Sequence, residues 1–146
     1  MSFSLPPIVK LAERLLVDIE QAVRTFARYH KYAIGADLRA QGMKVVRFAH
    51  RAWRQRAAQL DWTRRLVTAV DNLKITLQIG SRLQAFRSFG QFEALARVAA
   101  DLGRQAGGWL RQQLGNHPKG QSAAAGTAQQ RAQILSTRGA PIGAAP

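Results

Sequence analysis

Five basic residues and no acidic residue occur between Lys44 and Leu60, in the segment KVVRFAHRAWRQRAAQL. If this segment is helical, four of the basic side chains lie within about 80° of one another on its surface: Lys44, Arg47, Arg51 and Arg54. Arginine binds phosphate through two parallel hydrogen bonds and stacks on nucleobases, whereas a solvated helix face normally carries charges of both signs. The spacing therefore favours a nucleic-acid-binding face, which Arg64 and Arg65 extend beyond a short turn.

The charge of the whole chain favours the same class of partner. Lys and Arg total 22 against 8 Asp and Glu, which gives a formal net charge of +14. Such an excess favours polyanions, namely RNA, DNA or an anionic membrane surface. A GC-rich genome would explain the high ratio of Arg to Lys, but not the scarcity of acids. Two other uses of the basic helix stay open: docking on an acidic protein, and lying on a membrane, although the bundle core needs its apolar side.

The sequence contains no arrangement of residues that indicates catalysis or metal binding. The histidines, His30, His50 and His117, share no helical spacing with acids that would make a metal site. The segment GNHPKGQS, Gly115–Ser122, is close to a phosphate-binding loop, but Gln121 stands where that loop has its lysine. The segment also does not join a strand to a helix. We therefore predict a protein that is not an enzyme and that uses no cofactor and no metal.

Hydrophobic periodicity predicts four helices that would carry these residues. Apolar residues recur at spacings of three and four over Pro7–Arg28, Ile34–Ala58, Asp61–Phe86 and Gln91–Leu114. The connections between these segments are short, which favours antiparallel neighbours. The sequence thus predicts an all-α fold, an antiparallel up-down four-helix bundle over residues 1–115. Residues 116–146 are rich in Ala, Gly, Gln and Pro and are predicted to be a disordered tail.

Several features predict a cytoplasmic protein. The chain has no cysteine, which fits a reducing, cytosolic setting. Its N-terminus, MSFSLPPIVK, lacks the basic region and continuous apolar run of a signal peptide. No stretch approaches the roughly 18 uncharged apolar residues of a membrane span. We accordingly expect no membrane partner.

The third predicted helix has two apolar faces. The stripe expected in the core consists of Trp62, Leu66, Ala69, Val70, Leu73, Leu77 and Gly80. A second stripe, on the other side of the helix, consists of Ile75, Ile79, Leu83 and Phe86. A single bundle needs only one buried face per helix, so the second stripe predicts contact with another subunit. The alternative is one broad stripe in a thick core.

Two segments resemble the Avd family, the accessory variability determinants of diversity-generating retroelements, and a third resembles the wider bundle family related to it. LARVAADLGRQAGGWLRQQ, Leu95–Gln113, is similar to the final helix of that family, with Gly103–Arg104 and Gly107–Trp109 matching its Gly-Arg pair and small-Gly-Trp group. DNLKITLQIGSRLQAFRSFGQFE, Asp71–Glu93, resembles the preceding helix and turn. YHKYAIGADLRAQ, Tyr29–Gln41, looks like the first helix junction of the wider four-helix-bundle family that includes 23S rRNA intervening-sequence proteins. The resemblance covers about residues 5 to 115.

The resemblance implies properties that the residue spacing does not. Members of the Avd family are highly basic four-helix bundles that assemble as homopentamers, shaped as a barrel with a central pore. They have no known enzymatic activity, and they bind the reverse transcriptase of the retroelement and its template-region RNA. The resulting complex makes adenine-mutagenised cDNA, which is a further candidate partner. No RNA-contact residues are carried over from the family, so the basic residues above are predicted from charge and geometry.

The combined prediction is a non-catalytic accessory subunit of a diversity-generating retroelement. It would bind the reverse transcriptase and the template RNA, and so support mutagenic cDNA synthesis. Two alternatives stay open. One is a bundle of the 23S rRNA intervening-sequence type, and the other is a structural helical scaffold without a nucleic-acid role.

Overall fold

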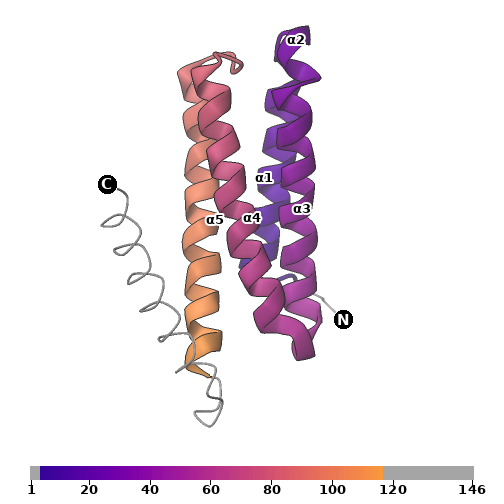
Figure 1. Ribbon diagram of the computed structural model, residues 1–146, viewed down its shortest axis with the longest axis vertical. Helices are drawn as coiled ribbons and strands as arrows, with labels where there is room; N and C mark the ends of the chain where they lie inside the picture. The colour runs from indigo at the N-terminus through magenta and orange to yellow at the C-terminus, as the bar shows by residue number, and fades with distance from the viewer. Residues whose placement is uncertain (1–3, 117–146) are drawn as a thin grey trace, which may run out of the picture. The chain divides into compact units, whose positions relative to one another are not determined.

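The computed structural model describes residues 4–116, and within this range the chain is entirely helical apart from its connections. Figure 1 shows four long helices joined in up-down order. The elements are α1 Pro7–Arg24, α2 Arg28–Lys31, α3 Ile34–Arg54, the 3-10 turn η1 Arg56–Ala58, α4 Gln59–Arg82 and α5 Phe89–Gly115. The prediction of an antiparallel four-helix bundle is confirmed. The chain divides after Leu114 into two units. The tail predicted to be disordered, residues 116–146, lies outside the described range from residue 117 onward.

The core of the first unit takes side chains from all four long helices. The periodic residues of the sequence form it, and its largest fully buried side chains include Leu15, Ile19, Leu38, Val45, Leu66, Leu73, Leu77 and Leu102. Helix α3 packs against both α1 and α4. A buried polar link joins α4 to α5: the Thr63 hydroxyl donates to the Gln59 carbonyl oxygen at 2.7 Å and accepts a hydrogen bond from Gln113 Nε2 at 2.9 Å. Because Thr63 makes both bonds, its burial leaves no unpaired hydroxyl.

Several helix ends differ from those predicted from the sequence. Helix α1 ends at Arg24 rather than Arg28, because the chain turns at Thr25 to bury Phe26 in the core. The segment predicted to be only a connection contains α2, a single helical turn. Helix α3 ends at Arg54 rather than Ala58 and is followed by η1. These ends depend on contacts between helices, which helical periodicity does not encode.

The connection between α4 and α5 is fixed by hydrogen bonds at both ends. The Ala85 N–H donates to the Gly80 carbonyl oxygen at 3.0 Å and closes the last turn of α4. Ser88 caps α5, because its Oγ accepts a hydrogen bond from the Gln91 N–H at 3.1 Å. Gln91 Oε1 in turn accepts from the Arg87 N–H at 2.9 Å. This pair of bonds explains why α5 begins at Phe89, before the predicted start.

Gln84 adopts a backbone conformation that usually belongs to glycine. Its φ is 59°, which lies in the left-handed region, directly after the C-cap of α4. A side chain in this region costs roughly 1 kcal/mol. We expect Gln84→Gly to raise the free energy of unfolding by about 0.5–1 kcal/mol, measured by denaturant unfolding. Gln84→Ala is the matched control, because Ala keeps the strain. Equal stability of the Gly and Ala variants would contradict this account.

Candidate nucleic-acid interface

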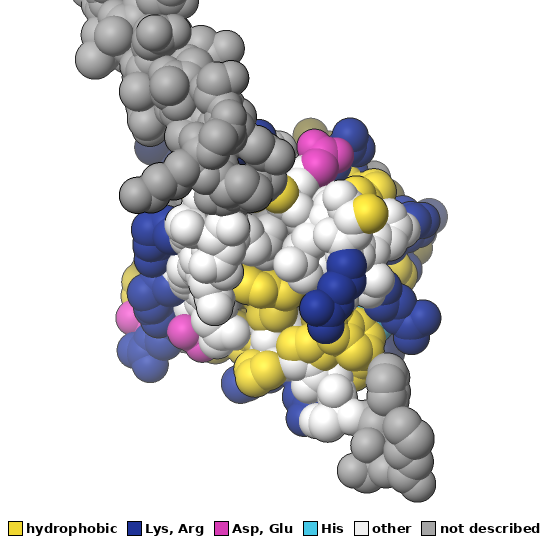
Figure 2. Space-filling model, turned by 90° about the horizontal axis from the view of Figure 1, so that it is seen from below, with side chains coloured by type: hydrophobic (Ala, Val, Ile, Leu, Met, Phe, Trp, Pro, Cys, Tyr) yellow, Lys and Arg dark blue, Asp and Glu magenta, His cyan; other side chains and the backbone are white. Residues whose placement is uncertain are grey.

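The structure places the six predicted basic residues on the exposed surfaces of two neighbouring helices. All six side chains are exposed: Lys44, Arg47, Arg51 and Arg54 on α3, and Arg64 and Arg65 on α4. The opposite side of α3 is fully buried through Val45, Ala49 and Ala52. In Figure 2, which views the end at which α3 meets α4, Lys and Arg side chains surround much of the visible rim and acidic side chains are few. The exposed basic surface therefore spans two helices.

Two arginines from different helices lie over the ring of Trp62. The guanidinium carbon of Arg51, on α3, is 5.2 Å from the ring centroid, and that of Arg65, on α4, is 4.9 Å from it. Trp62 lies in the first turn of α4, next to the short α3–α4 connection. Its indole N–H donates to Gln55 Oε1 at 2.9 Å, which fixes the ring in the connection. The ring thus holds two cationic groups together across the helix pair.

Phe48 joins this arrangement from α3. Its ring centroid is 5.4 Å from that of Trp62, and the Lys44 ammonium lies 6.0 Å from its centre. We name Lys44, Phe48, Arg51, Trp62 and Arg65 the basic–aromatic cluster. A guanidinium stacked on a ring keeps its N–H edge available for hydrogen bonds, and that edge matches two phosphate oxygens. The cluster can therefore hold phosphate with side chains that are already positioned.

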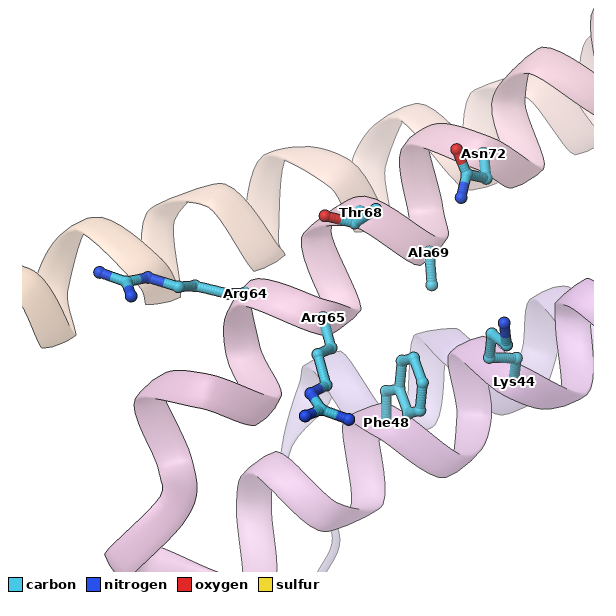
Figure 3. A pocket seen from close by; sticks show the side chains of 7 residues that line it. All are labelled: Lys44, Phe48, Arg64, Arg65, Thr68, Ala69 and Asn72. Atoms are coloured by element: carbon cyan, nitrogen blue, oxygen red, sulfur yellow. The ribbon is translucent and has the colours of Figure 1, made fainter. Parts of the chain in front are cut away.

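An open hollow of about 370 Å³ adjoins the cluster between α3 and α4 (Figure 3). Its lining is Lys44, Phe48, Arg64, Arg65, Thr68, Ala69 and Asn72. Lys44 and Asn72 point toward each other across the hollow, and the guanidinium of Arg65 lies beside the Phe48 ring. Arg64 extends away from Phe48. The hollow offers cations, a hydroxyl and an amide around an aromatic wall, a set of groups that suits a sugar–phosphate backbone.

The predicted stripe on α3 is divided rather than continuous. Arg54 lies over Trp53, with 5.5 Å between its guanidinium carbon and the ring centroid. On the same side of α3, His50 Nε2 is 2.7 Å from Glu13 Oε2 of α1. Lys44 and Arg51 instead contact aromatic rings beside α4. Acidic groups therefore occupy the flank toward α1, and the flank toward α4 is the more cationic one.

The predicted basic residues also differ in whether they form a salt bridge with an acid. Arg65 Nε is 3.2 Å from Asp61 Oδ2, so its charge is partly balanced at the exposed start of α4. Within residues 4–116, no salt bridge involves the four basic residues of the α3 stripe: Lys44, Arg47, Arg51 and Arg54. Exposed pairs such as Arg65–Asp61 are worth well under about 1 kcal/mol. Arg65 can therefore exchange this partner for a phosphate at small cost.

The sequence alone did not identify the two aromatic members of the cluster. Trp62 was assigned to the core because it continues the heptad of Leu66 and Leu73, but it is only half-buried. Phe48 follows Lys44 by four residues and precedes Arg51 by three. On a helix these spacings place neighbours side by side, so they are the signal that could have indicated Phe48. Predicting the contact between Phe48 and Trp62 requires knowledge of how α3 is aligned against α4, and residue spacing along the sequence does not provide it.

The second apolar stripe of α4 is exposed over three of its four predicted residues. Ile75 is 60% exposed, Ile79 44% and Leu83 49%. The prediction that Phe86 continues this stripe is wrong, because α4 ends at Arg82. Phe86 instead packs edge-on against Phe26, with 5.1 Å between ring centroids. The exposed apolar stripe is therefore Ile75, Ile79 and Leu83.

The structure shows neither a metal centre nor a membrane span in the described part of the chain. Residues 4–116 hold no group of three or more His, Cys, Asp or Glu side chains placed to bind a metal ion. No helix in this range is both long and apolar enough to cross a bilayer.

Comparison of the chain with protein-family models, with curated proteins and with solved structures found no match. The resemblance to the Avd family therefore depends on the segments Asp71–Glu93 and Leu95–Gln113 quoted above.

Proposed function

We propose that this protein is a non-catalytic accessory subunit that holds RNA through its backbone phosphates. The observation that carries the proposal is the basic–aromatic cluster, in which Arg51 and Arg65 lie over one indole, 5.2 and 4.9 Å from its centroid. The guanidinium groups of Arg51 and Arg65 repel each other, so an anion bound between them would stabilise the cluster. A polyanion supplies such anionic groups at regular intervals.

The geometry favours binding to phosphates over the reading of base sequence. The hollow beside the cluster is open, and its polar groups are the three cations of Lys44, Arg64 and Arg65 with one hydroxyl and one amide. Sequence is read by side chains that reach base edges within a groove. The exposed side of α3 is a convex helix surface whose basic side chains are spread along about three turns of helix. Such a surface binds phosphates and positions a nucleic acid without specifying its sequence.

The assignment to a diversity-generating retroelement follows from the resemblance of the segments Asp71–Glu93 and Leu95–Gln113 to the Avd family. In that setting the protein binds the reverse transcriptase and the template-region RNA, with the cDNA as a further candidate, and supports mutagenic cDNA synthesis in the cytoplasm. A reverse-transcriptase gene and a template–variable repeat pair beside the coding gene would support this assignment. Their absence would favour the 23S rRNA intervening-sequence type of bundle.

A homopentamer is part of the proposal. The exposed stripe Ile75, Ile79 and Leu83 supports it, because large apolar side chains in a row on an outer helix face usually mark an interface. Five subunits would repeat the basic–aromatic cluster around a ring. Once one cluster holds an RNA, the other four act at high effective concentration, so modest contacts add up to tight binding.

A salt titration tests the RNA-binding proposal. If Lys44, Arg47, Arg51 and Arg65 each neutralise a phosphate, the plot of log affinity against log salt for duplex RNA should have a slope of about −3 or steeper. Fluorescence anisotropy of a labelled duplex measures this slope. Weak binding that charge reversal at Arg47, Arg51 and Arg54 leaves unchanged would instead favour a scaffold without a nucleic-acid role. Binding that is insensitive to salt would contradict the phosphate mechanism.

A further inference from the structure

The end of the bundle opposite the α3–α4 connection forms a second surface, built from two separate connections. Figure 1 shows α2 at this end. Gln91 Nε2, in the first turn of α5, donates to Thr25 Oγ1 at 3.2 Å, and Phe86 packs on Phe26. The connection that contains α2 and the connection between α4 and α5 therefore meet here. About 15 Å of helix separates the start of α3 at Ile34 from Lys44, so this surface is distinct from the basic–aromatic cluster.

Aromatic rings are unusually exposed on this surface. Tyr29 is 81% exposed, Tyr32 71% and Phe89 69%. Helix α2 buries none of its residues, so these tyrosines do not serve the core of the bundle. Aromatic side chains normally bury most of their area or find a partner for it. Tyr29 contacts only the neighbouring His30 ring and Phe89 only the Phe92 ring among the ring contacts of the described residues, so a large part of each ring stays open for another planar group to stack on.

The two connections that meet at this end carry basic side chains and no acidic ones, although Asp37 lies in the first turn of α3 and Asp18 lines a hollow together with Arg87. No acidic residue lies between Glu20 and Asp37, and none lies between Asp71 and Glu93. Apart from Lys74, which lies in the middle of α4 and pairs with Asp71, the basic residues of the two stretches are Arg24, Arg28, Lys31, Arg82 and Arg87. None of these takes part in a salt bridge within residues 4–116. Exposed rings and unbalanced cations therefore occur together at this end.

A small aromatic hollow adds to this surface. It measures about 260 Å³ and is lined by Ser81, Gln84, Phe86, Ser88, Phe89 and Phe92. Aromatic rings together with hydroxyls and an amide match an unpaired base, which stacks through its face and forms hydrogen bonds through its edge. Gln84 lines this hollow from its left-handed backbone position. Strained backbone of this kind is often kept where a side chain serves binding.

We infer that this end of the bundle binds single-stranded nucleic acid. Unpaired bases stack on Tyr29, Tyr32 and Phe89, while Arg28, Lys31 and Arg87 hold the adjoining phosphates. A duplex gains little here, because its bases are already stacked on one another. For its class of ligand the inference rests on the proposed RNA-binding function. The inference adds to that function a second binding site, which accepts single-stranded rather than double-stranded nucleic acid.

An anionic membrane is a less suitable ligand for the same surface. Helices that bind membranes bury a broad apolar face among the lipids. Helix α2 is one turn long and has the sequence RYHK, with no aliphatic side chain. Tyr29 in this helix and Tyr32 directly after it can stack on any base, because every base has a flat π-face. The surface therefore fits bases better than acyl chains.

The test compares single-stranded and double-stranded probes on the full chain. Tyr29→Ala/Tyr32→Ala should weaken binding of an unstructured oligouridine by at least about tenfold, because base stacking on both rings is lost. Binding of a duplex of equal length should change by less than about twofold, because duplex bases do not reach the tyrosines. Tyr29→Phe/Tyr32→Phe is the matched control, since it keeps both rings, and it should bind oligouridine as the unmodified chain does. An oligouridine that carries abasic residues should bind the Ala variant and the unmodified chain equally.

The outcomes separate this inference from the proposed function. If the Ala variant binds oligouridine as well as the unmodified chain does, the inference is overturned, while duplex binding by the cluster can still stand. If duplex binding is absent but the tyrosine variants change oligouridine binding, the proposed cluster fails and the inference stands. Equal losses on both probes would overturn stacking as the mechanism. Loss of binding to phosphatidylserine vesicles with unchanged oligouridine binding would assign the surface to membranes instead.

Discussion

Replacing Lys44, Arg51 and Arg65 together with glutamine should weaken binding of duplex RNA by about a hundredfold. Each of these cations makes a charge-assisted contact worth about 1 kcal/mol or more, and a total of about 3 kcal/mol corresponds to a factor of about 100. The slope of log affinity against log salt should become shallower by about 2–3, because three fewer counterions are released. Anisotropy titrations over a range of salt concentrations measure both quantities.

The chain offers a control with the same loss of charge at other positions. Arg14, Arg97 and Arg104 are exposed, and each already contacts an acid on its own helix. Arg14→Gln/Arg97→Gln/Arg104→Gln lowers the net charge as much as the cluster variant does. If binding depends on the cluster, the control should lose far less affinity. Equal losses in the two variants would show that net charge alone drives binding, and the cluster would then have no special role.

Ile75→Glu/Ile79→Glu should convert the proposed homopentamer into monomers. Glutamate at these positions would bury charge in an apolar interface, and an unpaired buried charge costs several kcal/mol. The fold of each subunit should survive, because both positions are exposed and lie opposite the buried side of α4. Light scattering or native mass measurement should show the mass falling about fivefold, with weaker RNA binding as the other four clusters are lost.

Val17→Glu is the control for the assembly experiment. Val17 is an exposed β-branched residue on α1, and replacing it adds one charge without touching the exposed apolar stripe of α4. We expect this variant to keep the mass of the unmodified protein. An unmodified protein that is monomeric at micromolar concentration would contradict the assembly proposal, and Ile75, Ile79 and Leu83 would then need another explanation.

The sequence was most informative where a periodic pattern corresponds directly to burial. Leu66, Leu73 and Leu77 recur at helical spacing, and all three are buried in the core. The position of α3 between α1 and α4 also follows from short connections. These features depend on neighbours along the chain, so a single sequence contains them.

The sequence was less informative where distant residues decide the outcome. Phe86 has helical spacing from Ile79 and Leu83, but a contact with Phe26 and the turn at Gln84 take it out of the helix. Trp62 has core spacing, but it holds Arg51 and Arg65 at the surface. In each case a contact between helices decides the position. Charge could therefore be predicted from the sequence, whereas the contact between the Phe48 and Trp62 rings could not.

Acidic residues of α1 contact one flank of α3, so charge is distributed asymmetrically around this helix. Glu13 contacts His50 and Glu20 contacts Arg39, so carboxylates are drawn to one flank of α3 and its flank toward α4 stays cationic. A separated charge of this kind gives the subunit a permanent dipole. The electric field of a nearby polyanion orients such a subunit before contact. A larger fraction of encounters then begins with the cationic flank of α3 facing the RNA. The acids of α1 would thus affect how fast an RNA is captured without ever contacting it.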